Sequence, residues 1–466
     1  MWSSRHVLLL TVLFLWPCPS AHAEVLVRWD LDQVPATDSL GISTLVLPAA
    51  NTAAVQDALR KGYRVLLEAD ASAVVTLKLP AGPVGGVVVK GTLSAQQLRA
   101  LRRRLSPGAR VISTIDGGSW PHVRLNWVTL RGDVLQVSSR TAQPWIENNG
   151  ARLYLERLRH PDAPGLLTYA WAPITVSDMH QGPALENYLV AIAEAGTLGG
   201  DLLLPLHERF QRSLVLGHPV ARAEWQQIRK TLEFYSWDLP ARYQRVSNIG
   251  VVTADADAAF LILNLLVRHN LPFEVIKPRE LASRKLDSLA MLVVIDQPDG
   301  DQLKVLQRFA GAGGTVVLPG LKGPFPWHAN PPVVKTDEQL TYHVGSGLVL
   351  ERTQQISDPN IFALDMRQAL ARQQRVLEIW NGTTVIASPY EDAETGTLLI
   401  TLLNYAHEAS PIQLRVRGTY SVVQYETPDT PAVLIPYRHS KGQTEFVLPD
   451  LRVGGRVFLS RHASAN

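Results

Sequence analysis

Acidic side chains follow several short apolar runs of this 466-residue chain, and they are the groups best able to do chemistry. Hydrolysis of a glycosidic bond normally needs two carboxyl groups, about 5.5 Å apart for retention of configuration and further apart for inversion. In a barrel of parallel strands, such groups must stand where the strands end, on the loop face. The candidates at these places are Asp30, Asp32, Glu68, Asp70, Asp116 and Glu147.

Aromatic residues accompany these acids in and after the segment Val111–Gly150. Trp120 and Trp145 lie within this segment, and Tyr169 and Trp171 end a later apolar run. An aromatic ring covers the C–H face of a pyranose, while charged and amide groups hydrogen-bond its hydroxyls. We therefore expect these four residues to contact a saccharide. The alternative is that the aromatic residues of the loops only pack around the barrel core.

The catalytic pair that we expect is Asp116 with Glu147. They follow two consecutive apolar runs, and the ends of adjacent strands can bring two carboxylates within reach of one bond. Each residue also has a structural interpretation: Asp116 precedes two glycines and suits a turn, and Glu147 could open the helix predicted over residues 151–160.

Three further acids, Asp30, Glu68 and Asp70, are expected to contact the substrate. Residues two apart on a strand share a side, so Glu68 and Asp70 can both point inward. The structural alternatives are ion pairs. Asp30 could cap its strand or pair with Arg28, and the two acids at 68 and 70 could pair with Lys90 on the neighbouring run.

Other chemistries find little support in the sequence. The 13 histidines show no H-E-x-x-H or H-x-H spacing, so no metal site is expected. There is no G-x-S-x-G elbow and no G-x-G-x-x-G loop, so we expect neither a serine hydrolase nor a nucleotide cofactor. A net charge of +3 gives no argument for nucleic acid.

Residues 1–23 have the features of a signal peptide. Arg5 and His6 precede an apolar run from Val7 to Trp16, and Ala21-His22-Ala23 is a suitable cleavage site. The single cysteine, Cys18, lies inside this segment. A mature chain without thiols fits a bacterial periplasm or exterior, and no later segment reaches membrane-spanning length.

Short apolar runs alternate with amphipathic stretches from residue 24 to residue 238, which predicts a parallel sheet covered by helices. Eight runs favour a compact (β/α)8 barrel, with a doubly wound open sheet as the alternative. The runs cover residues 25–30, 42–48, 64–70, 85–91, 110–116, 133–139, 165–171 and 200–206.

Two further domains are expected after the barrel. Residues 246–335 alternate strands and helices in a pattern typical of a flavodoxin-like α/β domain, and residues 336–375 are interpreted as a connecting segment. From residue 376 to 462 short strands follow one another with turn signals between them, which predicts a β-sandwich.

This order of domains resembles the three-domain β-galactosidases of glycoside hydrolase family 42. The end of the chain is similar to their terminal sandwich, in TLLITLLNY and in TEFVLPDLRVGGRVFLS. The resemblance implies a general-acid glutamate at the end of strand 4 and a nucleophilic glutamate at the end of strand 7. Here strand 4 ends at Val89-Lys90-Gly91 and strand 7 ends at Tyr169-Ala170-Trp171, so neither glutamate carries over.

Taken together, the sequence predicts an exported glycoside hydrolase-like protein that binds a saccharide in the barrel cleft, and it leaves open whether a non-standard carboxylate pair hydrolyses that saccharide. The alternative is a non-catalytic protein that binds polysaccharide or assists the assembly or export of an exopolysaccharide. The missing acids favour the alternative, whereas the acids and aromatic residues of the other strand ends favour hydrolysis or at least binding.

Overall fold

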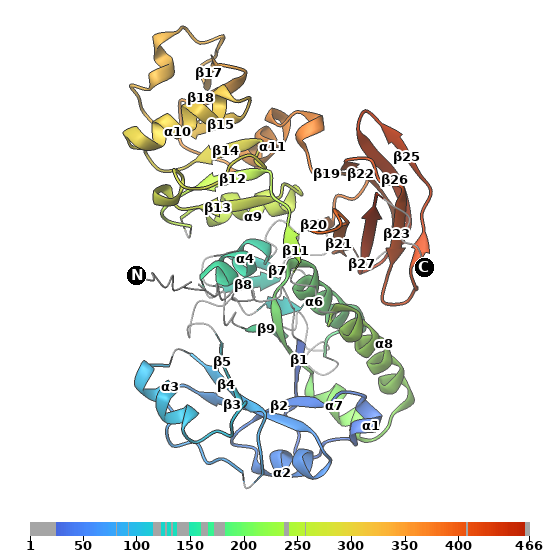
Figure 1. Ribbon diagram of the computed structural model, residues 1–466. Helices are drawn as coiled ribbons and strands as arrows, with labels where there is room; N and C mark the ends of the chain where they lie inside the picture. Colours follow the sequence, from blue (N-terminus) through green and yellow to red (C-terminus); the bar gives the residue numbers. More distant parts are fainter. Residues whose placement is uncertain are drawn as a thin grey trace, which may run out of the picture.

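The computed structural model describes residues 25–80, 82–91, 93–114, 123–125, 128–131, 134–137, 149–159, 166–171, 182–236, 242–256, 258–406 and 409–461. Figure 1 shows the barrel strands and their helices at the bottom, the second unit at the upper left and the β-sandwich at the right. Nowhere in the described ranges is a helix long and apolar enough to cross a membrane.

Eight parallel strands form the first sheet, in the order β5-β4-β3-β2-β1-β10-β9-β6. This is the order of a (β/α)8 barrel, but the described parts of β5 and β6 share no ladder, so the predicted barrel is not closed there. The strands are β1 (Val25–Arg28), β2 (Thr44–Pro48), β3 (Arg64–Asp70), β4 (Gly86–Lys90), β5 (Arg110–Thr114), β6 (Val123–Leu125), β9 (Leu166–Trp171) and β10 (Asp201–Pro205).

The sixth strand differs from its prediction. The run 133–139 forms β8 (Val134–Val137), which pairs antiparallel with β7 (Val128–Arg131) in a separate two-stranded sheet. The place beside β9 is taken by β6, where Val123 pairs with Tyr169. Only two residues separate β7 from β8 in the chain, so their pairing closes a very short loop at a small cost in chain entropy.

Two of the helices around this sheet, α2 and α3, begin at side-chain caps. Asn51 accepts from the backbone N–H of Ala54 at 3.1 Å, and Ser94 forms a capping box with Gln97. The helices are α1 (Thr37–Leu40), α2 (Thr52–Arg60), α3 (Ala95–Arg102), α4 (Gly150–Arg159), α6 (Leu185–Leu198), α7 (Glu208–Val215) and α8 (Pro219–Tyr235). Their apolar faces cover the outer side of the sheet, where each buried large side chain contributes about 1.5–3 kcal/mol.

The second unit is a seven-stranded sheet in the order β13-β12-β14-β15-β18-β17-β16, whose first five strands are parallel and follow the flavodoxin order. Its elements are β12 (Ile249–Val252), α9 (Phe260–Arg268), β13 (Phe273–Ile276), β14 (Met291–Val294), α10 (Gly300–Gly311), β15 (Thr315–Pro319), β16 (Val334–Lys335), β17 (Gln339–Val344), β18 (Gly347–Arg352) and α11 (Pro359–Ala369). The expected connecting segment 336–375 is therefore largely part of this unit, because it contains β17, β18 and α11.

The C-terminal unit consists of two antiparallel sheets around one apolar core. One sheet has the order β11-β20-β21-β27-β23-β24 and the other β19-β22-β26-β25. The strands are β11 (Tyr243–Arg245), β19 (Leu377–Trp380), β20 (Val385–Asp392), β21 (Leu398–Asn404), β22 (Ser410–Arg417), β23 (Val422–Glu426), β24 (Val433–Leu434), β25 (Tyr437–Ser440), β26 (Gln443–Leu451) and β27 (Gly454–Ser460). In the chain, β11 lies between the last barrel helix α8 and the second unit, but it pairs with β20 of the sandwich. The link between the first two units is therefore part of the third.

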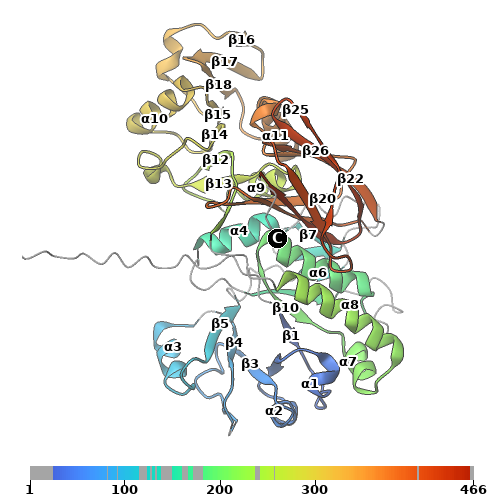
Figure 2. The ribbon, with the colours of Figure 1, turned by 45° about the vertical axis from the view of Figure 1, so that its right-hand side comes forward.

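The barrel helix α6 joins the first and third units. It packs against β10 on one side and against β20, β21 and β27 on the other, and both views show it between these parts (Figures 1 and 2). Two hydroxyls cross this contact. Thr401 Oγ1 of β21 donates to the Thr197 carbonyl of α6 at 3.1 Å, and Thr197 Oγ1 donates to the Leu402 carbonyl of β21 at 3.3 Å. The buried Glu194 of the same helix accepts from the Tyr405 hydroxyl and from Asn149 Nδ2.

Candidate active site

A charged layer lies on top of an apolar layer inside the barrel sheet. The apolar layer is Leu26, Val46, Leu66, Val88, Ile112 and Leu203, one residue from each of six strands. Two residues further along β1, β3 and β4 stand Arg28, Glu68 and Lys90, which alternation places on the same inner side. Charge therefore begins where the strands approach their carboxyl ends, the end at which barrel enzymes keep their sites.

Glu68 is the centre of this layer and is only 6% exposed. Its Oε2 lies 2.9 Å from Arg28 Nε and 3.0 Å from Lys90 Nζ. The contact with Arg28 is an ion pair without hydrogen-bond geometry, because Nε has no hydrogen-bond partner. Both cations are partly exposed, so the carboxylate is enclosed by them from the solvent side.

Asp30 and Asp70 stand one layer further out. Asp30 Oδ1 lies 3.2 Å from Arg28 Nη2, which is the ion pair considered from the sequence, and the Asp30 side chain is 37% exposed. Asp70 is exposed at the end of β3, beside Lys90 in the ladder. Two carboxylates thus border the mouth of the barrel while Glu68 lies below them.

The loop after β1 is held in place by Gln211 of α7. Gln211 is fully buried; its Oε1 accepts from the backbone N–H of Asp30 at 2.9 Å and of Leu31 at 3.3 Å, and its Nε2 donates to the Leu206 carbonyl at 2.7 Å. From the other side, Asn51 Nδ2 donates to the Asp30 carbonyl at 3.0 Å. The backbone of Asp30 is therefore held by side chains from α7 and from the N-cap of α2.

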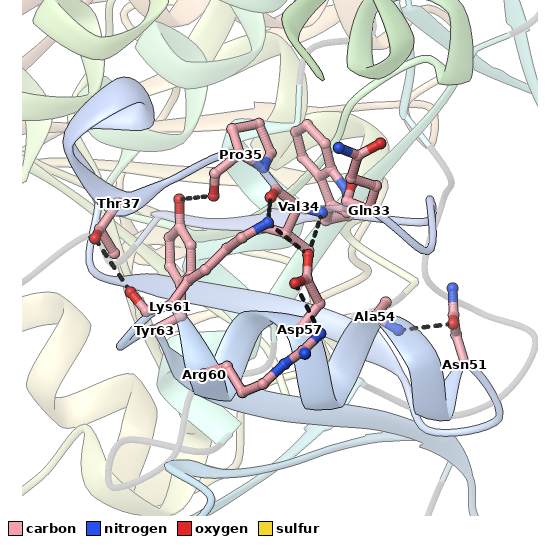
Figure 3. Close-up of polar contacts among 11 residues, drawn as sticks. Gln33, Val34, Pro35, Thr37, Asn51, Ala54, Asp57, Arg60, Lys61 and Tyr63 are labelled. Atoms are coloured by element: carbon pink, nitrogen blue, oxygen red, sulfur yellow. Dashed lines mark hydrogen bonds and ion pairs between the residues drawn. The ribbon is translucent and has the colours of Figure 1, made fainter. Parts of the chain in front are cut away.

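Figure 3 shows how α2 holds the rest of this loop. Asp57 Oδ2 accepts from the backbone N–H of Val34 at 2.9 Å and from Lys61 Nζ at 2.7 Å, and Lys61 also donates to the Val34 carbonyl. The Tyr63 hydroxyl donates to the Pro35 carbonyl at 3.1 Å. Burial acts to raise the pKa of Asp57, but hydrogen bonds from Lys61 and Val34 outweigh it, so that the pKa is lowered.

The remaining predicted site residues are placed only in part. Asp116, Glu147, Trp120 and Trp145 lie outside the described residues. Asp116 and Glu147 were expected at the ends of adjacent barrel strands. The run 133–139 that precedes Glu147 instead forms β8 of the hairpin, and β6 takes the place beside β9.

Tyr169 and Trp171 lie on β9, at strand position 7 of the barrel order. Their backbones pair with Val123 and Leu125 of β6. Position 7 therefore ends at a tryptophan, and position 4 ends at Lys90 of β4. Within the described residues, no group of three histidine, cysteine or acidic side chains is arranged to hold a metal ion.

Sequence reasoning missed Gln211 and Asp57. Asp57 had a signal, because Lys61 follows it at the i,i+4 spacing of a helical ion pair. Gln211 had none, since a glutamine on an amphipathic helix gives no sign that its amide will reach a loop 180 residues earlier in the chain.

Solved structures with the same overall arrangement include glycoside hydrolases. The α-L-fucosidase isoenzyme 2 from Paenibacillus thiaminolyticus is 10% identical, covers 95% of this chain and 100% of its own, and superposes with a TM-score of 0.60. The β-galactosidase from Bacillus circulans sp. alkalophilus is 9% identical, with 95% and 99% covered and a TM-score of 0.53. Gan42B, a family 42 β-galactosidase from G. stearothermophilus, is 9% identical, with the same coverage and a TM-score of 0.50.

No family model and no curated protein matches the chain by sequence. The structural likeness covers the whole order of domains, so this protein has a multi-domain glycoside hydrolase-like fold. The resemblance to family 42 is confirmed at the level of the fold, and the low identity is that of a divergent relative.

Proposed function

We propose that this chain is an exported protein that binds a saccharide across the carboxyl ends of its barrel strands. The observation that carries the proposal is the charged layer of Arg28, Glu68 and Lys90 with Asp30 and Asp70 above it. Carboxylates at the mouth accept hydrogen bonds from sugar hydroxyls, and the ion pairs below keep them in position. In a glycoside hydrolase-like barrel this face is where the ligand belongs.

Binding without hydrolysis is supported by the ends of strands 4 and 7. Lys90 ends the fourth strand and Trp171 the seventh, the two places where family 42 enzymes carry their acids. This observation favours the alternative function, a polysaccharide-binding protein or an accessory of exopolysaccharide assembly or export. Hydrolysis would have to use Asp116 and Glu147, with Trp120 and Trp145 as further sugar contacts.

A glycan array and a hydrolysis screen on the mature protein test both arms. We expect saturable binding that weakens about tenfold, or about 1.4 kcal/mol, in Asp30→Ala and Asp70→Ala. Asp301→Ala is the matched control, because Asp301 is an exposed acid on α10 of the second unit. No binding to any glycan, or equal binding by all variants, contradicts the proposal.

The same screen separates binding from catalysis. Turnover that disappears in Asp116→Asn and in Glu147→Gln assigns hydrolysis to that pair. Binding without turnover, unchanged in these two variants, assigns the non-catalytic function. Export is tested separately by mass spectrometry of the protein recovered from the periplasm or medium, for which we expect Glu24 as the first residue.

A further inference from the structure

A cavity of about 170 Å³ lies in the second unit, between the segment that leaves β18 and the first turn of α11. It is close to the carboxyl ends of two parallel strands, because the Gly320 backbone N–H after β15 donates to the Arg352 carbonyl at 3.0 Å. Open parallel sheets commonly bind ligands outside the carboxyl ends of their strands. The proposed saccharide face of the barrel belongs to a different unit (Figure 1).

The size of the cavity limits the ligand. One water needs about 10–15 Å³ of such a volume, so the cavity holds roughly ten or more water-sized groups. This suits one sugar ring with its hydroxyls. A drug-sized or nucleotide ligand would need about 300 Å³ or more.

The walls combine an apolar side with side-chain amides and a hydroxyl. Phe362, which is 2% exposed, and Ile361, which is 54% exposed, supply the apolar side. Gln354, Gln355 and Ser357 supply donors and acceptors, and all three are exposed. Amides and hydroxyls beside an apolar wall can satisfy the hydroxyls and the C–H face of a pyranose.

The charges of the cavity disfavour an anion. Its one cation, Arg352, is ion-paired with Asp365 and lies 5.8 Å from the centre of the Phe362 ring. Two carboxylates, Glu338 and Asp358, also line the cavity. A carboxylate or phosphate ligand would face these two acids without a free cation to meet it.

The N-terminus of α11 gives no anion site either. Asp358 Oδ1 accepts from the backbone N–H of Asn360 at 2.8 Å and of Ile361 at 3.1 Å, so the helix is already capped by its own acid. The cavity is therefore suited to bind a neutral ligand that donates hydrogen bonds to carboxylate and amide oxygens.

We propose that this cavity is a second saccharide-binding site, which takes one neutral pyranose unit between the segment after β18 and α11. It is separate from the barrel site and does not require that site to be occupied. A protein with both sites would hold a polymer at two points, and the weak affinity of each would combine.

Hydrogen–deuterium exchange of the full mature chain, with a panel of neutral monosaccharides as probes, tests the proposal. We expect glucose, galactose, mannose, fucose or N-acetylglucosamine to protect the amides of residues 353–362, with a Kd of about 1 mM. Ile361→Trp fills the cavity and should abolish this protection, and Gln355→Ala should weaken binding at least tenfold. Leu261→Trp on α9 is the matched control, because Leu261 is 56% exposed and does not line the cavity.

Asp30→Ala separates this proposal from the proposed function. Protection of residues 353–362 should be unchanged in Asp30→Ala, whereas protection of the barrel strand ends should decrease. No saturable protection of residues 353–362 with any neutral sugar, or equal protection in Ile361→Trp and wild type, overturns the second site. A barrel site that fails while residues 353–362 are still protected overturns the proposed function alone.

Discussion

Glu68→Gln tests whether the charged layer of the barrel is held together by one buried carboxylate. The substitution keeps the shape of the side chain and removes its charge. Arg28 Nε and Lys90 Nζ both lie within 3.0 Å of the same oxygen, so these nitrogens are at most about 6 Å apart. Two unit charges at about 6 Å repel by about 3 kcal/mol at an effective dielectric constant of about 20.

The net cost is smaller than this repulsion. The Lys90 side chain is 46% exposed and can turn toward water, whereas the Glu68 side chain is only 4% exposed and cannot. Breaking a fully buried pair costs about 3–5 kcal/mol and an exposed pair about 0–1 kcal/mol, so we expect Glu68→Gln to lower the free energy of unfolding by about 2 kcal/mol.

Urea denaturation of the variants measures this loss. Lys90→Met should cost less than about 1 kcal/mol, because the lysine side chain is half in water and leaves Arg28 to pair with the acid. The double variant should cost less than the sum of the two, since removal of the lysine also removes the repulsion. Asp70→Asn, on the exposed end of the same strand, is the control and should stay within about 0.5 kcal/mol of wild type.

Two results would refute the reasoning. A loss below about 0.5 kcal/mol for Glu68→Gln would mean that water or a neighbouring group already neutralises the layer. A strictly additive double variant would mean that Glu68 and Lys90 do not interact in solution, whatever the distance between them.

Three further predictions concern the contacts that position the barrel face. Gln211→Ala leaves two backbone N–H groups and one carbonyl unsatisfied and should cost about 2–3 kcal/mol in urea denaturation, with faster exchange of the amides at positions 30 and 31. Asp57 has a lowered pKa, so its contribution to stability is complete above its unfolded pKa of about 3.9 and is lost as the pH falls through the folded value; Asp57→Asn should therefore flatten the stability profile below about pH 4. Tyr405→Phe removes a hydrogen bond to the buried Glu194 and should cost about 1.5–3 kcal/mol, measured as earlier proteolysis between barrel and sandwich, whereas Thr401→Ser keeps its hydroxyl and should not.

The pH range of the Tyr405 contact follows from its surroundings. Burial first, and then the neighbouring Glu194, raise the pKa of Tyr405 well above its usual value of about 10. A raised pKa means that the phenol's contribution is complete below about pH 10 and is lost only as the pH rises further. The Tyr405 hydroxyl therefore keeps its proton and can donate to Glu194 over the whole neutral range.

The alternation of apolar runs and amphipathic stretches was enough to predict the parallel sheets, because buried parallel strands have a continuous apolar pattern. It could not decide which run after β5 joins the barrel. Val134–Val137 and Val123–Leu125 are both short, and the choice depends on pairing. Gly132-Asp133 between two apolar runs is the sequence signal of a two-residue hairpin connection.

The same signal was missed in the segment interpreted as a connector. Gly345 and Ser346 form the two-residue connection of the β17–β18 hairpin, where Val344 pairs with Gly347. Gly345 has a φ of 58°, which glycine adopts without strain. The pairing of β18 with β15 joins segments more than 30 residues apart, and no local pattern encodes it.

The acids at the ends of β1 and β3 show why position in the sequence predicts the place of a side chain better than it predicts a reaction. Asp30, Glu68 and Asp70 were recognised from their places at the ends of apolar runs, and Lys90 as a partner of the acids, because position on a strand is a local property. Their protonation and reach depend on neighbours from other strands, and here Glu68 is engaged by two cations at once. A general acid must give up a proton to the leaving group, which requires a carboxyl group that is free to approach it. Glu68 lacks that freedom because it is engaged by Arg28 and Lys90, so we propose that this layer supports binding and that any hydrolysis would use other acids.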